Sequence, residues 1–262
     1  MPPPAPARAE IWGTEQFILP SRALGRDMLI QVARAAAPDA RKVPVVYLLD
    51  GNLMFGIAAD TALMTSFTSD AGPAYIVGVG YPSQLAKDWL VRRSMDLVHA
   101  VTTHPEAGGM PTGGGALFER FLREELLPAI EARYPVDPAN STLFGHDYGG
   151  LFAAHVLLNA PGSFRNYVIG SPGLWAEPAL LEQAARFRGN GRTGVFLAVG
   201  GSEDADMQKS TKSLLLALTR KDAGLKVESL IIKGEGHTTM LPSFISRGLR
   251  WAVPVEPNKG AP

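Results

Sequence analysis

The sequence contains no cysteine, and this absence excludes several kinds of chemistry at once. Without thiols the chain can form no disulfide bond, no thiolate metal site and no iron–sulfur cluster, and it has no cysteine nucleophile. Only five histidines remain for acid–base or metal chemistry. The sequence also lacks a run of about 18 apolar residues, so we expect no membrane span.

An excess of charge of either sign is missing as well. Lysine plus arginine and aspartate plus glutamate both number 25, so the formal net charge is zero. A nucleic acid or an anionic membrane is bound by a basic surface, and the composition gives no sign of one. We therefore expect a small-molecule substrate, with no nucleic acid or membrane partner; the oligomeric state stays open.

The 262 residues, 46% of them apolar, are enough to bury a full core. Residues 1–10 are rich in proline and lack the apolar region of a secretion signal, so we expect a disordered tail and a cytoplasmic protein. No long linker interrupts the chain. We expect one domain over residues 11–252, followed by a C-terminal tail over 253–262.

Continuous apolar runs alternate with amphipathic segments, which is typical of a doubly wound α/β fold. After an antiparallel pair at 11–19 and 28–33, the runs predict buried strands at 45–49, 74–79, 141–144, 167–170, 195–199 and 227–232. Helices are predicted at 116–134, 149–159, 180–187, 207–221 and 240–251. Pro128 should kink or divide the first of them. The predicted fold is a central, mostly parallel sheet with helices on both faces.

The segment Phe144-Gly-His-Asp-Tyr-Gly-Gly150 joins a predicted strand to a predicted helix. This is the context of the Gly-x-Ser-x-Gly nucleophile elbow, in which a sharp reversal leaves no room for side chains two positions from the centre. Gly145 and Gly149 occupy those two positions. The central residue, however, is Asp147, whose negative charge the start of the helix would favour.

The chain resembles the esterase family of the α/β-hydrolases, which includes esterase D, feruloyl esterases, siderophore esterases and mycolyltransferases. The resemblance spans roughly residues 12–251 and implies an α/β-hydrolase fold and hydrolase activity. It is carried by Val45-Val-Tyr-Leu-Leu-Asp-Gly51, by the elbow with Gly150-Leu-Phe-Ala-Ala after it, by Ile169-Gly-Ser-Pro-Gly-Leu-Trp175, and by Gly234-Glu-Gly-His237.

Family members have serine where this chain has Asp147, so three interpretations of that residue stay open. Asp147 is a nucleophile, as in the similar His-Asp-Trp-Gly elbows of haloalkane dehalogenases and epoxide hydrolases. Alternatively, Asp147 acts as a general base or an electrostatic group. In the third interpretation the position is degenerate or was changed by engineering, and the protein is an inactive esterase fold that binds a ligand.

Carboxylate chemistry limits the first interpretation. A carboxylate that attacks an epoxide or alkyl halide forms an ordinary ester, whereas one that attacks an ester forms a high-energy anhydride. Epoxide hydrolases carry a helical cap, and only about 25 residues separate Ser171 from the strand at 195–199. We therefore predict the esterase scaffold without a large cap domain.

The resemblance places the general base at His237, in a glycine-containing loop after the last predicted strand. An ordinary histidine pKa near ~6.5 suits a residue that must accept and return a proton at neutral pH. The orienting acid should follow the strand at 195–199, which makes Glu203 the first candidate and Asp204 the second. Asp206 is the candidate N-cap of the next helix.

The resemblance also predicts the groups around the substrate. The backbone N–H groups of Tyr148 and Asn52 are the expected oxyanion hole. Gly51 should let the chain approach the substrate closely, and Trp175 should line the cleft. Arg93, in an Arg-x-x-Asp stretch with Asp96, is equally consistent with an ion pair and with a substrate contact.

No cofactor or metal is predicted. His99 and His104 flank a loop in which no carboxylate stands at metal-ligand spacing, and His155 lies inside a predicted helix, where a histidine is usually structural. The catalytic candidates are therefore Asp147, His237, Glu203 and Asp204.

Overall fold

The computed structural model describes residues 10–35, 42–83 and 85–255. The tails expected at 1–10 and 253–262 lie for the most part outside these residues. In the described part, no helix is long and apolar enough to cross a membrane.

Eight strands form one sheet in the order β1-β2-β4-β3-β5-β6-β7-β8. β1 and β2 pair in antiparallel fashion, as do β2 and β4, and the pairs from β4 to β8 are parallel. The mostly parallel sheet predicted from the apolar runs is confirmed. The strands are Thr14–Ser21, Arg26–Ala35, Val43–Leu48, Ala74–Gly80, Val136–His146, Asn166–Gly170, Gly194–Gly200 and Lys226–Ile232, numbered β1 to β8.

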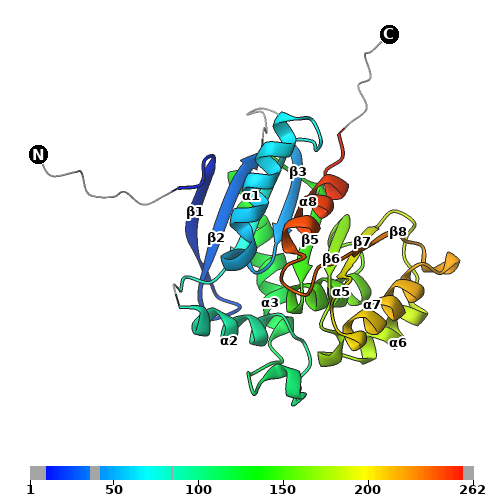
Figure 1. Cartoon of the computed structure of the whole chain (residues 1–262). Helices are drawn as coiled ribbons and strands as arrows, with labels where there is room; N and C mark the ends of the chain where they lie inside the picture. Colours follow the sequence, from blue (N-terminus) through cyan, green and yellow to red (C-terminus); the bar gives the residue numbers. More distant parts are fainter. Residues whose placement is uncertain (1–9, 36–41, 84, 256–262) are drawn as a thin grey trace, which may run out of the picture.

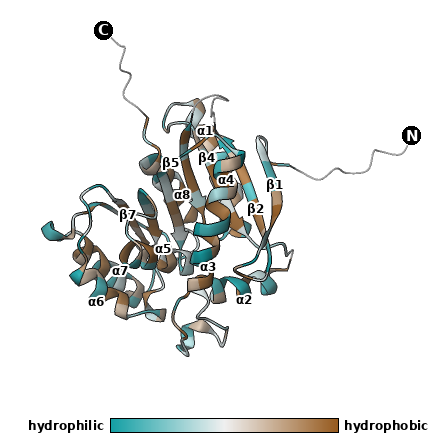
Figure 2. Cartoon of the chain, turned by 180° about the vertical axis from the view of Figure 1, so that it is seen from behind, coloured by the Kyte–Doolittle hydropathy of each residue, from teal (hydrophilic) through white to brown (hydrophobic). Residues whose placement is uncertain are grey.

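Helices cover both faces of the sheet (Figure 1). One face is covered by α1 (Gly51–Phe67) and α8 (Leu241–Ala252), whose apolar side chains form one core cluster with Val46, Leu48 and Phe144 of the strands. The larger cluster lies on the other face (Figure 2). The helices that contribute to it are α3 (Gly115–Phe121), α4 (Leu127–Arg133), α5 (Tyr148–Asn159), α6 (Ala179–Arg186) and α7 (Ala205–Leu218).

Two helices were not predicted from the sequence, namely α1 and α2 (Ala86–Asp96). The periodic signal is weak in α1 because apolar residues occur on all its sides, and Leu53, Met64 and Phe67 are about half exposed or more. Neither helix begins with a side chain that caps its N-terminus, so the usual start signal is also missing.

The helix predicted over 116–134 is divided into three parts. A π-helical turn at Leu122–Leu126 separates α3 from α4, and Pro128 lies in the first turn of α4. The helical hydrogen bonding continues through this turn, since the N–H of Leu127 donates to the carbonyl oxygen of Leu122. Pro128 has no N–H to donate, so the ladder is interrupted at that residue. The predicted helix is therefore divided, as expected, but the division is the π turn, which ends two residues before Pro128.

Three neighbouring strands end in residues with positive φ angles. Asp50 (φ 54°) follows β3, Asp147 (φ 57°) follows β5, and Ser171 (φ 38°) follows β6. At Asp147 the reversal from β5 into α5 is so tight that a Cβ atom on Gly145 would lie 2.1 Å from the carbonyl oxygen of Gly149. The elbow predicted from the glycine spacing is thus present, with Asp147 at its turn.

We predict that Gly145→Ala destabilises the fold by about 3 kcal/mol or more, since only backbone atoms surround the new methyl group and they cannot move aside. Urea unfolding with an unchanged m value would measure the loss. Gly56→Ala is the matched control, because its Cβ would meet only Ile11 at 3.5 Å within α1. The control should gain about 0.5–1 kcal/mol from helix propensity. Equal stability of the two variants would contradict the tight elbow.

Candidate active site

The candidate site lies at the carboxyl edge of the parallel strands, where three predicted residues meet. Asp147 stands on the turn between β5 and α5, Glu203 follows β7, and His237 lies in the loop between β8 and α8. Loops at this edge of a parallel sheet converge, which is why residues far apart in sequence become neighbours here.

His237 lies between the two carboxylates. Its Nδ1 is 2.7 Å from Glu203 Oε2, and its Nε2 is 3.7 Å from Asp147 Oδ1. The first distance is a hydrogen bond, whereas the second leaves the Nε2 nitrogen facing Asp147 without a direct bond. The imidazole side chain is 40% exposed, so solvent and substrate can reach it.

Glu203 is the better placed of the two predicted acids. Its buried carboxylate also accepts hydrogen bonds from Ser171 Oγ and from the backbone N–H of Gly200, which fix it behind the imidazole. Asp204 instead caps α7, where its side chain accepts hydrogen bonds from the N–H groups of Asp206 and Met207. Asp204 as orienter and Asp206 as N-cap were therefore both wrong, because the helix begins two residues earlier than the apolar pattern indicated.

Arg93 connects Asp147 to a second buried carboxylate. Its Nε and Nη2 donate to the two oxygens of Asp50 at 2.6 and 2.9 Å, and its Nη1 donates to Asp147 Oδ2 at 3.0 Å. Asp50 and Arg93 are both less than one-tenth exposed. Asp96, the other half of the Arg-x-x-Asp stretch, pairs with Arg26. The guanidinium of Arg93 therefore belongs to the site, and its link to Asp50 is an ion pair.

The surrounding charges set the protonation states. Burial would raise the pKa of Asp147, but Arg93, His237 and His146 outweigh it and hold that pKa below its ordinary value. Burial, followed by the nearby His237, lowers the pKa of His146 to about 4. The hydrogen bond that His237 donates to Glu203 raises the pKa of His237, and the nearby Asp147 also raises it, whereas burial lowers it. Asp147 is thus an anion at neutral pH beside a basic His237 and a neutral His146.

The predicted oxyanion-hole residues stand at two helix starts. Tyr148 is the first residue of α5 and Asn52 the second of α1. Backbone N–H groups in a first helical turn have no intrahelical acceptor and can bind an anion. The Asn52 side chain exchanges hydrogen bonds with the backbone of Tyr81, which fixes the start of α1. A Cβ on Gly51 would lie 3.0 Å from the backbone of β4, so this glycine is needed for packing against that strand.

Aromatic rings stand beside Asp147. Trp175 packs against Tyr148 at 5.6 Å and against His104 at 5.0 Å between ring centroids. Arg93 lies over the Tyr148 ring at 4.9 Å. Gly173 faces both the Trp175 indole and the Asp147 carboxylate, since a Cβ there would be 3.4 and 3.5 Å from them. Trp175 is therefore placed to contact a substrate at Asp147.

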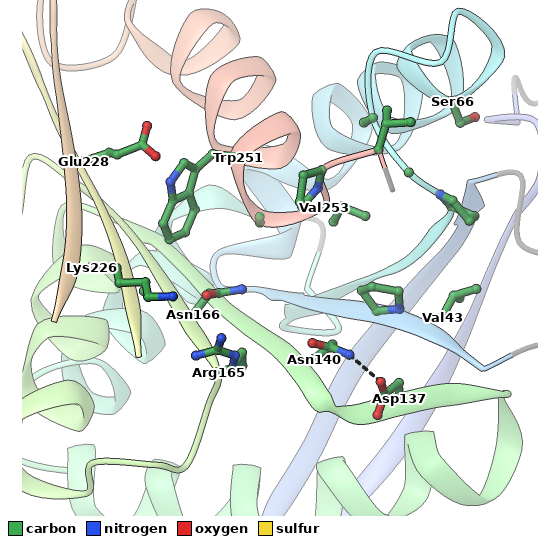
Figure 3. A pocket seen from close by; sticks show the side chains of 18 of the residues that line it. Val43, Ser66, Asp137, Asn140, Arg165, Asn166, Lys226, Glu228, Trp251 and Val253 are labelled. Atoms are coloured by element: carbon green, nitrogen blue, oxygen red, sulfur yellow. Dashed lines mark hydrogen bonds between the residues drawn. The ribbon is translucent and has the colours of Figure 1, made fainter. Parts of the chain in front are cut away.

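A cavity also lies elsewhere in the described part of the chain. It has a volume of about 900 Å³ and is lined by the amino ends of β5 to β8 and the last residues of α1 and α8, including Arg165, Asn166, Lys226 and Trp251 (Figure 3). This is the edge of the sheet opposite to Asp147. None of Asp147, Glu203 and His237 lines this cavity, and we locate the candidate site by its chemistry.

The family model described as "Putative esterase" matches residues 21–239. The chain belongs to this family. The match includes the elbow, Glu203 and His237, and it places the protein among the ester hydrolases, in agreement with the resemblance of the sequence motifs.

Relatives of this esterase-family chain cover nearly all of it. Ferri-bacillibactin esterase BesA of Bacillus subtilis is 32% identical over 92% of this chain and 90% of its own. Siderophore triacetylfusarinine C esterase of Aspergillus fumigatus is 29% identical over 93% of this chain and 94% of its own. The crystal structure of the BES protein from Bacillus cereus superposes with a TM-score of 0.84 at 31% identity, covering 97% of this chain and 99% of that one.

Two contributors to the candidate site were missed from the sequence. Asp50 was quoted only within the Val45–Gly51 motif, although an acidic residue shortly after a buried strand is a signal that could have been used. Ser171 was not singled out, yet its side chain is fully buried and holds Glu203. Both roles depend on contacts between segments that are far apart in sequence.

We predict that Glu203→Gln lowers the pKa of His237, because the largest cause of its raised value is the bond to the Glu203 carboxylate. A folded-state pKa above the unfolded value stabilises the fold at low pH, and this contribution is lost as pH rises through the folded pKa. The stabilisation of the fold by protonated His237 should therefore be lost at a higher pH in the wild type than in the Glu203→Gln variant. NMR titration of the His237 ring protons measures the pKa directly.

Asp204→Ala is the control for Glu203→Gln. It should cost about 1 kcal/mol, as expected for a lost N-cap, and leave the His237 titration unchanged. A shift of the His237 pKa in Asp204→Ala but not in Glu203→Gln would reverse the assignment of the orienting acid.

Proposed function

We propose that this protein hydrolyses an ester bond of a small molecule, with Asp147 at the nucleophile position and His237 as the general base. One observation carries the proposal. In a chain of the esterase family, the imidazole of His237 lies between a buried orienting carboxylate and the residue at the elbow, at 2.7 and 3.7 Å. That is the arrangement that acid–base catalysis at an elbow requires.

In the proposed reaction, His237 Nε2 removes a proton from a water molecule as the water oxygen attacks the ester carbonyl carbon. The carbonyl oxygen becomes an oxyanion, which the backbone N–H groups of Tyr148 and Asn52 stabilise. When the tetrahedral intermediate collapses, the C–O bond to the alcohol breaks and His237 returns its proton to the leaving oxygen. Glu203 stabilises the imidazolium in between.

Asp147 acts here as a carboxylate that orients water and stabilises the protonated imidazole. Its lowered pKa keeps it ionised, and the hydrogen bond from Arg93 withdraws electron density from Oδ2. Direct attack by Asp147 on an ester would form an anhydride, so for ordinary esters the water route is the easier one. The carboxylate also carries a cost, since its negative charge repels the developing oxyanion.

The relatives suggest the class of substrate. BesA and the Aspergillus fumigatus protein are named as esterases of siderophores. The side chain of Trp175, which packs on the buried Tyr148 ring next to Asp147, offers flat apolar surface to a substrate. We infer a siderophore ester as the substrate class, held against the Trp175 ring with its carbonyl at Asp147.

We predict that the protein hydrolyses at least one member of a panel of p-nitrophenyl esters, lactones and siderophore esters above the rate in buffer. His237→Ala should abolish this activity, because His237 removes the proton from the attacking water in the proposed reaction. Epoxides and haloacids belong in the same panel, since turnover of these alone would favour Asp147 as a nucleophile. No turnover of any compound, with thermal stabilisation by one of them, would favour the inactive ligand-binding protein.

We further predict that Asp147→Ser raises ester hydrolysis by at least ~10-fold. The new hydroxyl can be deprotonated by His237, and Nη1 of Arg93 loses a carboxylate partner and can donate to the substrate instead. Rates of p-nitrophenyl ester hydrolysis for parent and variant measure the change.

Asp147→Asn is the matched control for the serine variant. It removes the charge without supplying a hydroxyl, so it should not reproduce the gain. His237→Ala in the serine variant should remove the gain, since such residues act as a unit. A folded serine variant that is inactive on every ester cleaved by the parent would contradict the proposed role of the elbow.

A further inference from the structure

A second group of ionisable side chains lies outside the candidate active site. It consists of His99 after α2, His155 in α5 and Glu177 after the short 3-10 turn Leu174–Ala176. One ligand atom from each residue lies within 4.8 Å of the others, and no other such group of three was found among residues 10–35, 42–83 and 85–255. His155 follows Asp147 by two helical turns, about 12 Å along the axis of α5.

Glu177 is the centre of the group. Its Oε2 lies 2.7 Å from His155 Nδ1, and its Oε1 lies 3.9 Å from His99 Nδ1. The same Oε1 accepts hydrogen bonds from the backbone N–H groups of His99 and Ala100. The carboxylate is thereby fixed in place with both oxygens facing the two imidazoles. Its side chain is only 6% exposed.

His99 is the unusual member, because both of its ring nitrogens are buried and neither makes a hydrogen bond within the described chain. Buried polar atoms without a partner are rare in native proteins and call for a physical explanation. On the side away from Glu177, His99 Nε2 lies 3.5 Å from a carboxylate oxygen of Glu119. A proton on Nε2 is therefore favoured, and it leaves the lone pair of Nδ1 facing Glu177.

We propose that His99, His155 and Glu177 form a binding site for a divalent zinc ion. Two imidazole nitrogens and one carboxylate are donors that zinc prefers, and water can complete its coordination. Glu119 beside His99 Nε2 matches the carboxylate–histidine–metal arrangement, in which an outer carboxylate orients a histidine ligand. A dication also compensates the negative charges of Glu177 and Glu119.

The metal-free arrangement indicates what must change on binding. The two rings stack in parallel, with centroids 3.4 Å apart and planes 3° apart. Their lone pairs cannot converge on one ion in that geometry, so at least one ring must turn about its Cβ–Cγ bond. His99 also stacks on Phe152 at 5.2 Å, which restrains it. The His155 side chain, 19% exposed, is the freer of the two to turn.

Zinc would join three segments that meet at the Glu177 carboxylate and at the stacked rings of His99 and His155. They are the chain after α2, which continues into the loop of His104, the elbow helix α5, and the segment that carries Trp175. Binding should therefore stabilise the fold and order the wall of the candidate site without supplying a catalytic group.

Calorimetric titration of the chelator-treated full chain with zinc chloride tests the proposal. We expect one ion bound per chain and a raised melting temperature at about a tenfold molar excess of zinc. His155→Gln and Glu177→Gln should each weaken binding by more than about 10-fold. In the wild type, NMR signals of the His99 and His155 ring protons should shift when zinc is added.

Two variants control for zinc bound elsewhere. His104→Gln removes a nearby histidine outside the cluster, and His237→Gln disables the other site that holds histidines and carboxylates; both should keep the binding. The proposal fails if zinc does not bind, or if binding survives in His155→Gln and Glu177→Gln but is lost in His237→Gln. If either cluster variant does not fold, unshifted His99 and His155 ring signals in the zinc-treated wild type are sufficient to overturn it.

Discussion

The carboxyl edge of the sheet depends on one buried guanidinium. Arg93 reaches from α2 to the ends of β3 and β5 and pairs with both Asp50 and Asp147. Removing one partner of a buried ion pair costs about 3–5 kcal/mol, since it leaves a charge without compensation. Without Arg93, two carboxylates would face each other across the elbow, and Asp147 could not stay ionised beside the imidazole of His237. Aspartate is therefore tolerated at the elbow because the guanidinium of Arg93 lies beside it.

Much of the fold could be predicted because its central strands are buried on both faces. The runs at 45–49, 74–79 and 195–199 are continuous and apolar, and each is a strand of the parallel sheet. The elbow could be predicted from the spacing of Gly145 and Gly149 around Asp147. Helix α1 could not, because its exposed Leu53 and Met64 obscure the helical period.

The candidate site could be predicted only as far as its residues belong to local motifs. His237 and Glu203 follow strands at positions that the sequence pattern marks. The choice between Glu203 and Asp204 depended on where α7 begins, and helix boundaries shift by a residue or two for local reasons such as capping. The pairing of Arg93 with Asp50 joins residues 43 positions apart, and that of Glu177 with His99 joins residues 78 apart. No periodicity or spacing predicts contacts of that kind.

The positive φ angles at the ends of β3, β5 and β6 limit which substitutions can stabilise this protein. A left-handed conformation at a residue other than glycine costs of order 1–3 kcal/mol. Asp50, Asp147 and Ser171 all carry this cost, side by side along one edge. Glycine at any of them would relieve strain and would also remove a side chain that holds Arg93, His237 or Glu203. At Asp50 the loss of a buried ion-pair partner would exceed that relief, so the strain along this edge can be removed only together with the contacts that hold the site.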